Sequence, residues 1–180
     1  MAHFAVTAVG ADRPGIVAGV TGAFVGLGCN LEDSSMTILR GQFAMMLVVD
    51  APAGVGAAEL DAALVAPAEA LDLVVTVRPA GQEGAGGSSE DAGSWTVAVY
   101  GADHPGIVHG VASLLAGLGV NIVDLSTRVV GEPGAPAYTM VLEVTLPAGA
   151  DPRHLGRRLE ATAAELGVTC RLHPAEADIL

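Results

Sequence analysis

The residues best suited to ligand chemistry form a short loop that the chain carries twice. The first copy reads "GADRPGIV" (residues 10–17) and the second reads "GADHPGIV" (residues 101–108). Asp-x-Pro-Gly ahead of an apolar period predicts the start of a helix. The first backbone amides of a helix have no intrahelical partner, and they favour an anion such as a carboxylate. Each loop is therefore a candidate anion-binding site.

The residue types within the loop suit such a site. Asp12 can cap the free amides, and Pro14 suits the first helical turn because its missing N–H would be unpaired there. Gly15 lets a ligand or another backbone approach closely. The same features start a helix without any ligand, so the loop alone leaves both interpretations open. The second copy repeats these residues as Asp103, Pro105 and Gly106.

An asparagine follows each expected helix. Asn30 and Asn121 stand three residues after Leu27 and Leu118, the last apolar positions of the helical period. Asn tolerates the left-handed conformation of a turn, which would be a purely structural role. Its side-chain amide also donates and accepts hydrogen bonds, which suits an amino-acid head group. The sequence leaves both roles open.

The loops belong to an internal duplication that covers most of the chain. Asp12 matches Asp103 at an offset of 91, and Phe43 matches Tyr138 at an offset of 95. The four extra residues lie in the Gly/Pro-rich stretch 131–137, where a loop lengthens at little cost.

A Gly-, Ser- and acid-rich segment, residues 80–94, separates the two copies. It has no apolar period and predicts a flexible linker. The sequence therefore predicts two domains, residues 1–79 and 95–180.

Each copy predicts the same order of elements. Alternating apolar residues at 4–8 predict a strand, and the period Ile16, Val20, Phe24 predicts a helix that Gly28 ends. A second strand opens at Asn30, a turn at residue 41 leads to a third strand, and a second helix precedes the last strand, residues 71–79. The order β-α-β-β-α-β is the ferredoxin-like plan, an α+β fold whose antiparallel four-stranded sheet carries both helices on one face. Its sheet edges need cover or a partner.

Residues 10–35 and 101–126 resemble the N-terminal half of ACT domains. In that family a strand is followed by Asp-x-Pro-Gly-hydrophobic, a helix, and Gly-hydrophobic-Asn-hydrophobic at the start of strand two. The tandem pair resembles the glycine cleavage system repressor type of ACT–ACT regulatory protein. The resemblance implies homodimers that bind an amino acid or similar small effector at interfaces between ACT units. It also implies contacts from the first loop and the start of strand two: Asp12, Arg13, Pro14, Gly15, Ile16, Asn30, Leu31, Asp103, His104, Pro105, Gly106, Ile107, Asn121 and Ile122.

The two copies differ at this expected site. Arg13 is replaced by His104, and Glu32 is replaced by Val123. The two sites therefore need not be equivalent, and one copy could bind while the other supports dimerisation. The resemblance implies regulation of a partner enzyme or of transcription through a protein partner. A ligand-free structural module that dimerises and holds a partner is the alternative.

The charge balance argues against direct nucleic-acid binding. All eight basic residues are arginines, against twenty acidic ones, which gives a formal net charge of −12. Nucleic-acid binding usually needs a clustered basic footprint, and the one local cluster, Arg153, Arg157 and Arg158, is typical of a solvated helix face. No apolar run is long enough for a membrane helix, and the N-terminus has no basic region of a signal peptide. We expect a cytoplasmic protein without a membrane partner.

No constellation of residues indicates an enzyme. Cys29 and Cys170 fall at non-equivalent places in the two copies and have no CxxC spacing, so we expect buried core thiols, no metal site and no catalytic thiol. The five histidines are scattered, and His104 and His109 do not share a helix face at their spacing of five. No nucleophile elbow or phosphate loop occurs, so we expect no cofactor.

Overall fold

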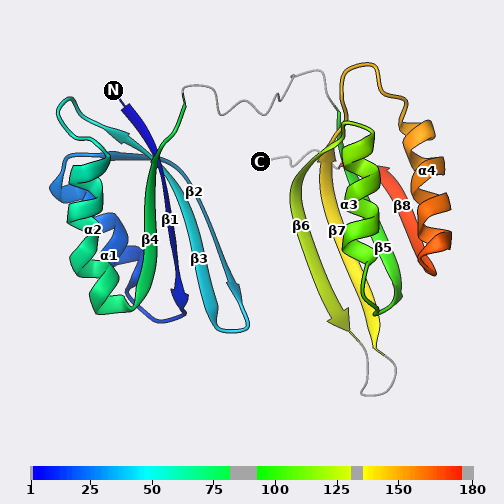
Figure 1. Ribbon diagram of the computed structural model, residues 1–180, viewed down its shortest axis with the longest axis horizontal. Helices are drawn as coiled ribbons and strands as arrows, with labels where there is room; N and C mark the ends of the chain where they lie inside the picture. The colour runs from blue at the N-terminus through cyan, green and yellow to red at the C-terminus, as the bar shows by residue number, and fades with distance from the viewer. Residues whose placement is uncertain (1, 82–92, 131–135, 176–180) are drawn as a thin grey trace. The chain divides into compact units, whose positions relative to one another are not determined.

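The computed structural model describes residues 2–81, 93–130 and 136–175, and it separates into two compact units, residues 1–86 and 87–180 (Figure 1). Most of the expected linker, residues 82–92, lies outside the described residues, as do residues 131–135 of the lengthened loop. The exact domain limits therefore stay a prediction. Each unit is described by itself below.

The first unit has six elements in the expected order. Their bounds are β1 (Ala2–Ala11), α1 (Ile16–Gly26), β2 (Asn30–Leu39), β3 (Gln42–Ala51), α2 (Ala57–Leu71) and β4 (Leu73–Pro79). The strands form an antiparallel sheet in the order β2-β3-β1-β4. The second strand starts at Asn30 and a two-residue turn at Arg40 and Gly41 closes the hairpin, both as predicted.

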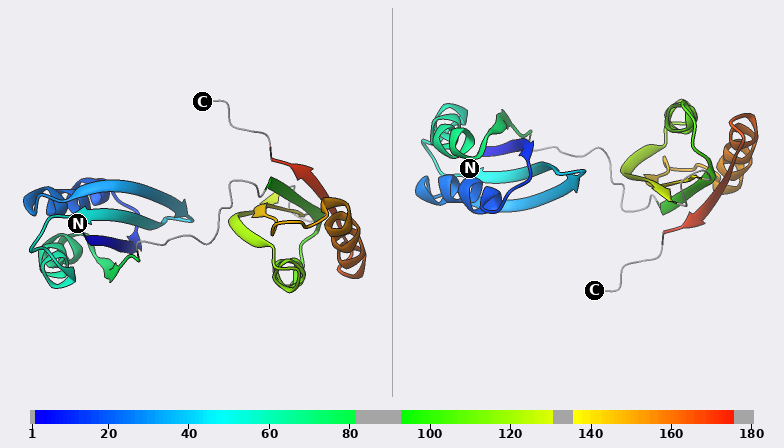
Figure 2. Two further views of the ribbon diagram at one scale, coloured as in Figure 1. Left: turned by 90° about the horizontal axis from the view of Figure 1, so that it is seen from above. Right: turned by 90° about the horizontal axis from the view of Figure 1, so that it is seen from below.

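The second unit repeats this plan. Its elements are β5 (Ser94–Ala102), α3 (Ile107–Gly117), β6 (Asn121–Val130), β7 (Ala137–Thr145), α4 (Pro152–Glu165) and β8 (Val168–Pro174), and the sheet order is β6-β7-β5-β8. Views along the sheets show both helices of each unit on one face of its sheet (Figure 2). The predicted α+β, ferredoxin-like fold is confirmed in both copies.

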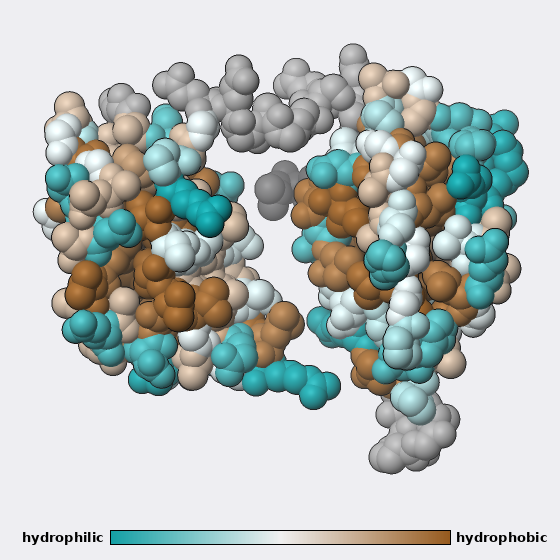
Figure 3. Space-filling view, viewed as in Figure 1, coloured by the Kyte–Doolittle hydropathy of each residue, from teal (hydrophilic) through white to brown (hydrophobic). Residues whose placement is uncertain are grey.

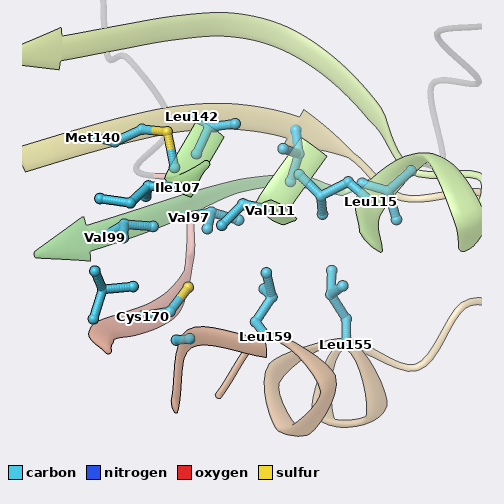
Figure 4. Packing of buried hydrophobic residues seen from close by; sticks show 14 of the residues in the cluster. Val97, Val99, Ile107, Val111, Leu115, Met140, Leu142, Leu155, Leu159 and Cys170 are labelled. Atoms are coloured by element: carbon cyan, nitrogen blue, oxygen red, sulfur yellow. The ribbon is translucent and has the colours of Figure 1, made fainter. Parts of the chain in front are cut away.

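Strand alternation supplies one face of each core, and the helical period supplies the other. In the second unit Val97 and Val99 of β5 point toward Ile107, Val111 and Leu115 of α3 (Figure 4). Each of these five side chains is at most 2% exposed. Burying one such side chain contributes about 1.5–3 kcal/mol, so each unit holds its own apolar core.

A glycine in each first helix faces a leucine at the C-terminal end of the second helix of its unit. A Cβ added at Gly19 would lie 2.8 Å from Cδ1 of Leu71, and one added at Gly110 would lie 2.9 Å from Cδ1 of Leu166. Any larger residue at either position would require the leucine side chain to move. The small size of Gly19 and Gly110 therefore has a packing role that is independent of ligand binding.

The two equivalent edge strands, β2 and β6, are barely covered. All ten side chains of β2 are exposed, and in β6 only Ile122 is half-buried. Apolar side chains of these edges reach the surface, among them Ile38, Leu39 and Val129. Figure 3 shows apolar side chains at the surface of both units. An exposed strand edge of this length and composition is suited to association.

Candidate functional site

The helix-start loop takes a conformation that its glycine makes possible. Gly15 is the N-cap residue of α1 with φ 95°, and Gly106 is the N-cap residue of α3 with φ 100°. This left-handed geometry costs other residues about 1–2 kcal/mol. The glycine of Asp-x-Pro-Gly is therefore required by the backbone itself.

The expected capping role of the aspartates is wrong. The N-cap position belongs to the glycine, and neither Asp12 nor Asp103 accepts a capping hydrogen bond. Pro14 lies two residues before α1 instead of in its first turn. The positive φ of the glycine turns the chain after the proline, so the aspartate lies outside the capping position.

The first turn of each helix consequently presents unpaired amides. In the described part of the chain, no backbone or side-chain acceptor meets the N–H groups of Ile16, Val17 and Ala18. The first backbone amide of this helix that donates a hydrogen bond is that of Gly19, which lies 2.8 Å from the carbonyl oxygen of Gly15. The second unit has the same arrangement. A helix N-terminus with open amides and positive dipole can hold a carboxylate.

Space beside each N-cap glycine is open. A Cβ built on Gly15 or Gly106 would meet nothing within 4 Å. The side chains of Ile16 and Ile107 are each 2% exposed and point into the cores. Any contact that these isoleucines make with a ligand therefore comes from their amides alone.

The residue that differs between the two loops is held differently. In the second unit the ring of His104 lies between two carbonyl oxygens, with Nδ1 3.0 Å from that of Pro105 and Nε2 2.7 Å from that of Leu166. The pKa of His104 is raised by these two hydrogen bonds, more by the one to Pro105 than by the one to Leu166. Only the imidazolium can donate both bonds. Arg13 is exposed and makes no ion pair with any described residue.

Asn30 and Leu31 lie at the opposite end of the unit from the loop. Asn30 pairs with Asp50, which pairs in turn with His3 near the start of β1. The amide of Asp12 instead donates to the carbonyl of Gly41 at the other end of the sheet, 2.8 Å away. Helix α1, about 16 Å long, separates the two places (Figure 1). One unit alone does not bring the expected contact residues together.

The second unit separates its expected contact residues in the same way. Asn121 and Ile122 pair with Thr145 and Val144 of β7, at the strand end next to the start of β5. The loop with His104 follows the end of β5.

Glycine, and not asparagine, makes the turn before the second strand. Gly28 has φ 69° and Gly119 has φ 68°, which confirms them as the residues that end the helices. Asn30 and Asn121 are not left-handed, so the structural role considered for them is wrong. Both side chains are exposed and make no hydrogen bond to a described residue. Their amides are available to a ligand or to a second unit.

The strand-two bulge is where Glu32 and Val123 differ. The register shifts between Leu31 and Asp33 in β2, and Nδ1 of His3 lies 2.9 Å from a carboxylate oxygen of Glu32. Val123 at the equivalent bulge is 62% exposed and carries no polar group. The two units therefore present different chemistry next to their asparagines.

Neither thiol is activated. The pKa of the half-buried Cys29 is raised mainly by burial and to a smaller extent by the negative charge of Asp50. The pKa of Cys170 is raised to about 11, mainly by burial and to a smaller extent by the negative charge of Glu160. A raised pKa keeps a thiol protonated and weakly nucleophilic. Within the described ranges, no group of three or more His, Cys, Asp or Glu side chains could hold a metal ion.

Comparison with known families gives the same assignment twice. The ACT domain family matches residues 2–78, and an ACT domain again matches residues 95–152. The chain belongs to the ACT-domain family. It is a tandem ACT protein, as the repeated loops predicted.

One relative of this ACT protein, named as a transcriptional repressor, aligns with it over most of both chains. The glycine cleavage system transcriptional repressor of Escherichia coli is 28% identical over 91% of this chain and 85% of its own. The UPF0237 protein MK1213 of Methanopyrus kandleri is 50% identical over 28% of this chain, a match that spans 56% of that protein. A crystal structure of an unknown protein from Galdieria sulphuraria matches with a TM-score of 0.82 and 28% identity, over 97% of this chain and 99% of that one.

No helix among the described residues is long and apolar enough to cross a membrane.

Proposed function

We propose that this tandem ACT protein is a cytoplasmic regulator, and not an enzyme, that binds a small amino acid where two ACT units meet. Binding changes the association or shape of the protein. The protein then acts on a protein partner or, indirectly, on transcription, and its working form is a homodimer. Its net charge of −12 argues against direct contact with DNA.

The observation that carries this proposal is the set of unpaired amides beside an open space. The N–H groups of Ile16, Val17 and Ala18 can receive the carboxylate of an amino acid. The open space beside Gly15 leaves room for the rest of a small ligand. The same amides and the same space recur beside Gly106.

A second unit is needed to complete the site. The loop and Asn30 lie at opposite ends of the strand β2 edge, which is exposed along its whole length. If two such edges pair antiparallel, the asparagine end of one unit meets the loop end of the other. The asparagine amide then reaches the amino or carboxylate group of a ligand held by the loop. The paired units can come from one chain or from two.

A panel of the twenty amino acids in a thermal-shift assay tests the proposal. A ligand at about ten times its Kd stabilises the folded state by about 1.4 kcal/mol. For domains of this size that raises Tm by roughly 5–10 °C. Glycine belongs among the first compounds, because the name of the Escherichia coli relative refers to glycine cleavage. A panel in which every amino acid at about 5 mM leaves Tm unchanged contradicts the proposal.

Variants separate binding from folding. Asn30 and Asn121 are exposed and bond to no described residue, so the change of both to alanine should remove the ligand-induced shift and leave the ligand-free Tm in place. Ser35→Ala is the matched control, because Ser35 is also exposed on β2 and is not one of the expected contact residues.

A ligand-free scaffold remains the second candidate, because the left-handed φ of Gly15 and Gly106 explains both glycines without a ligand. In that case both units still associate through β2 and β6, while the Asn30→Ala and Asn121→Ala changes and every amino acid leave Tm and oligomeric state unaltered.

A further inference from the structure

A pocket of about 390 Å³ lies on the second unit, at the opposite end of β5 from the loop with His104 and two strands away from Ile122. Trp95 and Leu172 line it from the sheet, and the first turns of α4 supply the remaining wall: Pro152, Arg153, Gly156, Arg157 and Glu160. The pocket is at the start of α4, whereas the bond between His104 and Leu166 lies beyond the end of that helix. The β8 side of the sheet, which it occupies, is also the edge opposite β6.

The glycine in this pocket has no packing cause. Gly156 stands inside α4, where glycine is less favourable than alanine. A Cβ added there would meet nothing within 4 Å, which holds as well for the helix glycines at 22, 26 and 117 but not for those at 19 and 110. Leaving this position without a side chain keeps the wall between Arg153 and Arg157 open.

The two arginines of the pocket are exposed and have positive charges that no described side chain neutralises. Within residues 2–81, 93–130 and 136–175, neither Arg153 nor Arg157 forms an ion pair. Arg153 also stands in the first turn of α4, where the helix dipole disfavours a cation. An anion beside the two guanidinium groups would neutralise their charge and offset the unfavourable position of Arg153.

The first repeat shows that the fold does not require this chemistry. Helix α2 has Ala58, Asp61 and Ala62 where α4 has Arg153, Gly156 and Arg157, and β1 has Phe4 where β5 has Trp95. The pair of arginines beside an aromatic ring is therefore particular to the second unit.

We propose that this pocket binds a small anion that joins a planar ring to a phosphate, in the manner of a mononucleotide. The guanidinium groups of Arg153 and Arg157 hold the phosphate oxygens, and the indole of Trp95 stacks on the ring. The carboxylate of Glu160, at the same wall, disfavours a second anionic group and can accept a hydrogen bond from an amine on the ring.

The intrinsic fluorescence of the full chain tests this directly, because Trp95 is its one tryptophan. The probes are AMP, adenosine and inorganic phosphate, each titrated at about 0.15 M salt so that surface charges are screened. We expect a saturable change in emission with AMP, and binding at least about tenfold weaker for adenosine or phosphate, each of which lacks one contact. No saturable change with AMP, or equal affinity for phosphate alone, overturns the proposal.

Variants of the pocket sharpen the result. The double change Arg153→Ala and Arg157→Ala should raise the Kd for AMP at least about tenfold, and each single change should raise it in part. Arg158→Ala, which removes one charge outside the pocket, is the control for each single change and should leave the Kd unchanged. Gly156→Ala should raise Tm and still weaken AMP binding, which a folding defect cannot mimic. AMP affinity that survives the double change refutes the site. Asn30→Ala and Asn121→Ala should not alter it, so this proposal and the effector proposal fail separately.

Discussion

The change Gly106→Ala tests the physical cause of the repeated loop. Gly106 has φ 100°, and its missing Cβ would meet no atom within 4 Å. The cost is therefore conformational and not steric. The left-handed geometry costs alanine about 1–2 kcal/mol. Alanine also lowers the entropy of the unfolded chain, which stabilises the folded state by about 0.4–1 kcal/mol. We expect a net loss of about 1 kcal/mol.

Gly117→Ala is the matched control, at the other end of the same helix. Gly117 is also exposed, also has nothing within 4 Å of an added Cβ, and does not have a positive φ. Alanine there should be neutral or stabilise the unit by about 0.5 kcal/mol, since it is the better helix former.

Urea unfolding followed by tryptophan fluorescence measures both changes, because Trp95 reports on the second unit alone. With m near 1 kcal/mol/M, the urea midpoint of Gly106→Ala should fall by about 1 M. An unchanged midpoint for Gly106→Ala, or an equal fall for Gly117→Ala, would refute the conformational account of the loop.

Three further predictions concern single side chains of the structure. The two carbonyl partners of His104 raise its pKa, so the imidazolium stabilises the folded state. This stabilisation should be complete below the unfolded pKa of about 6.5 and should decline as pH rises through the higher folded pKa. Measurement of Tm against pH for the wild type and for His104→Asn checks this, and parallel curves would contradict it. The hydroxyl of Tyr138 is buried without a partner among the described residues, and the first repeat has Phe43 there, so Tyr138→Phe should be neutral or stabilise by up to about 1 kcal/mol in urea unfolding, while a clear loss would reveal a missed partner. Burial raises the pKa of Cys29 and of Cys170, so iodoacetamide at pH 7.5 should alkylate both more slowly than the thiol of an unstructured peptide, and Cys170 most slowly. Fast labelling of either cysteine in the native protein would contradict this.

Local patterns in the sequence were sufficient to predict the elements of this fold. Apolar alternation and the period through Ile16, Val20 and Phe24 each report one buried face, and Gly28 reports a helix end, so these predictions depend on neighbouring residues alone. The duplication then supplied a second, independent instance of each pattern.

The geometry of the site was harder to predict because it depends on φ angles and on distant residues. The sequence signals for a proline in the first turn and an aspartate cap were both present, yet the left-handed φ of Gly15 moves the helix start past them. The bond from His104 to Leu166 joins residues 62 positions apart, and no local pattern marks it. The separation of Asn30 from the loop follows from topology, since the helix between β1 and β2 returns the chain to the opposite end of the sheet.

Isothermal titration calorimetry with the amino acid that raises Tm most is the most direct test of effector binding where ACT units meet. The account predicts saturable heat for the wild type and for Ser35→Ala, and at least about tenfold weaker binding when Asn30 and Asn121 are both alanine, the loss expected for one or more ligand hydrogen bonds. Heat that is absent for all twenty amino acids, or that is undiminished in the double asparagine variant, would contradict it.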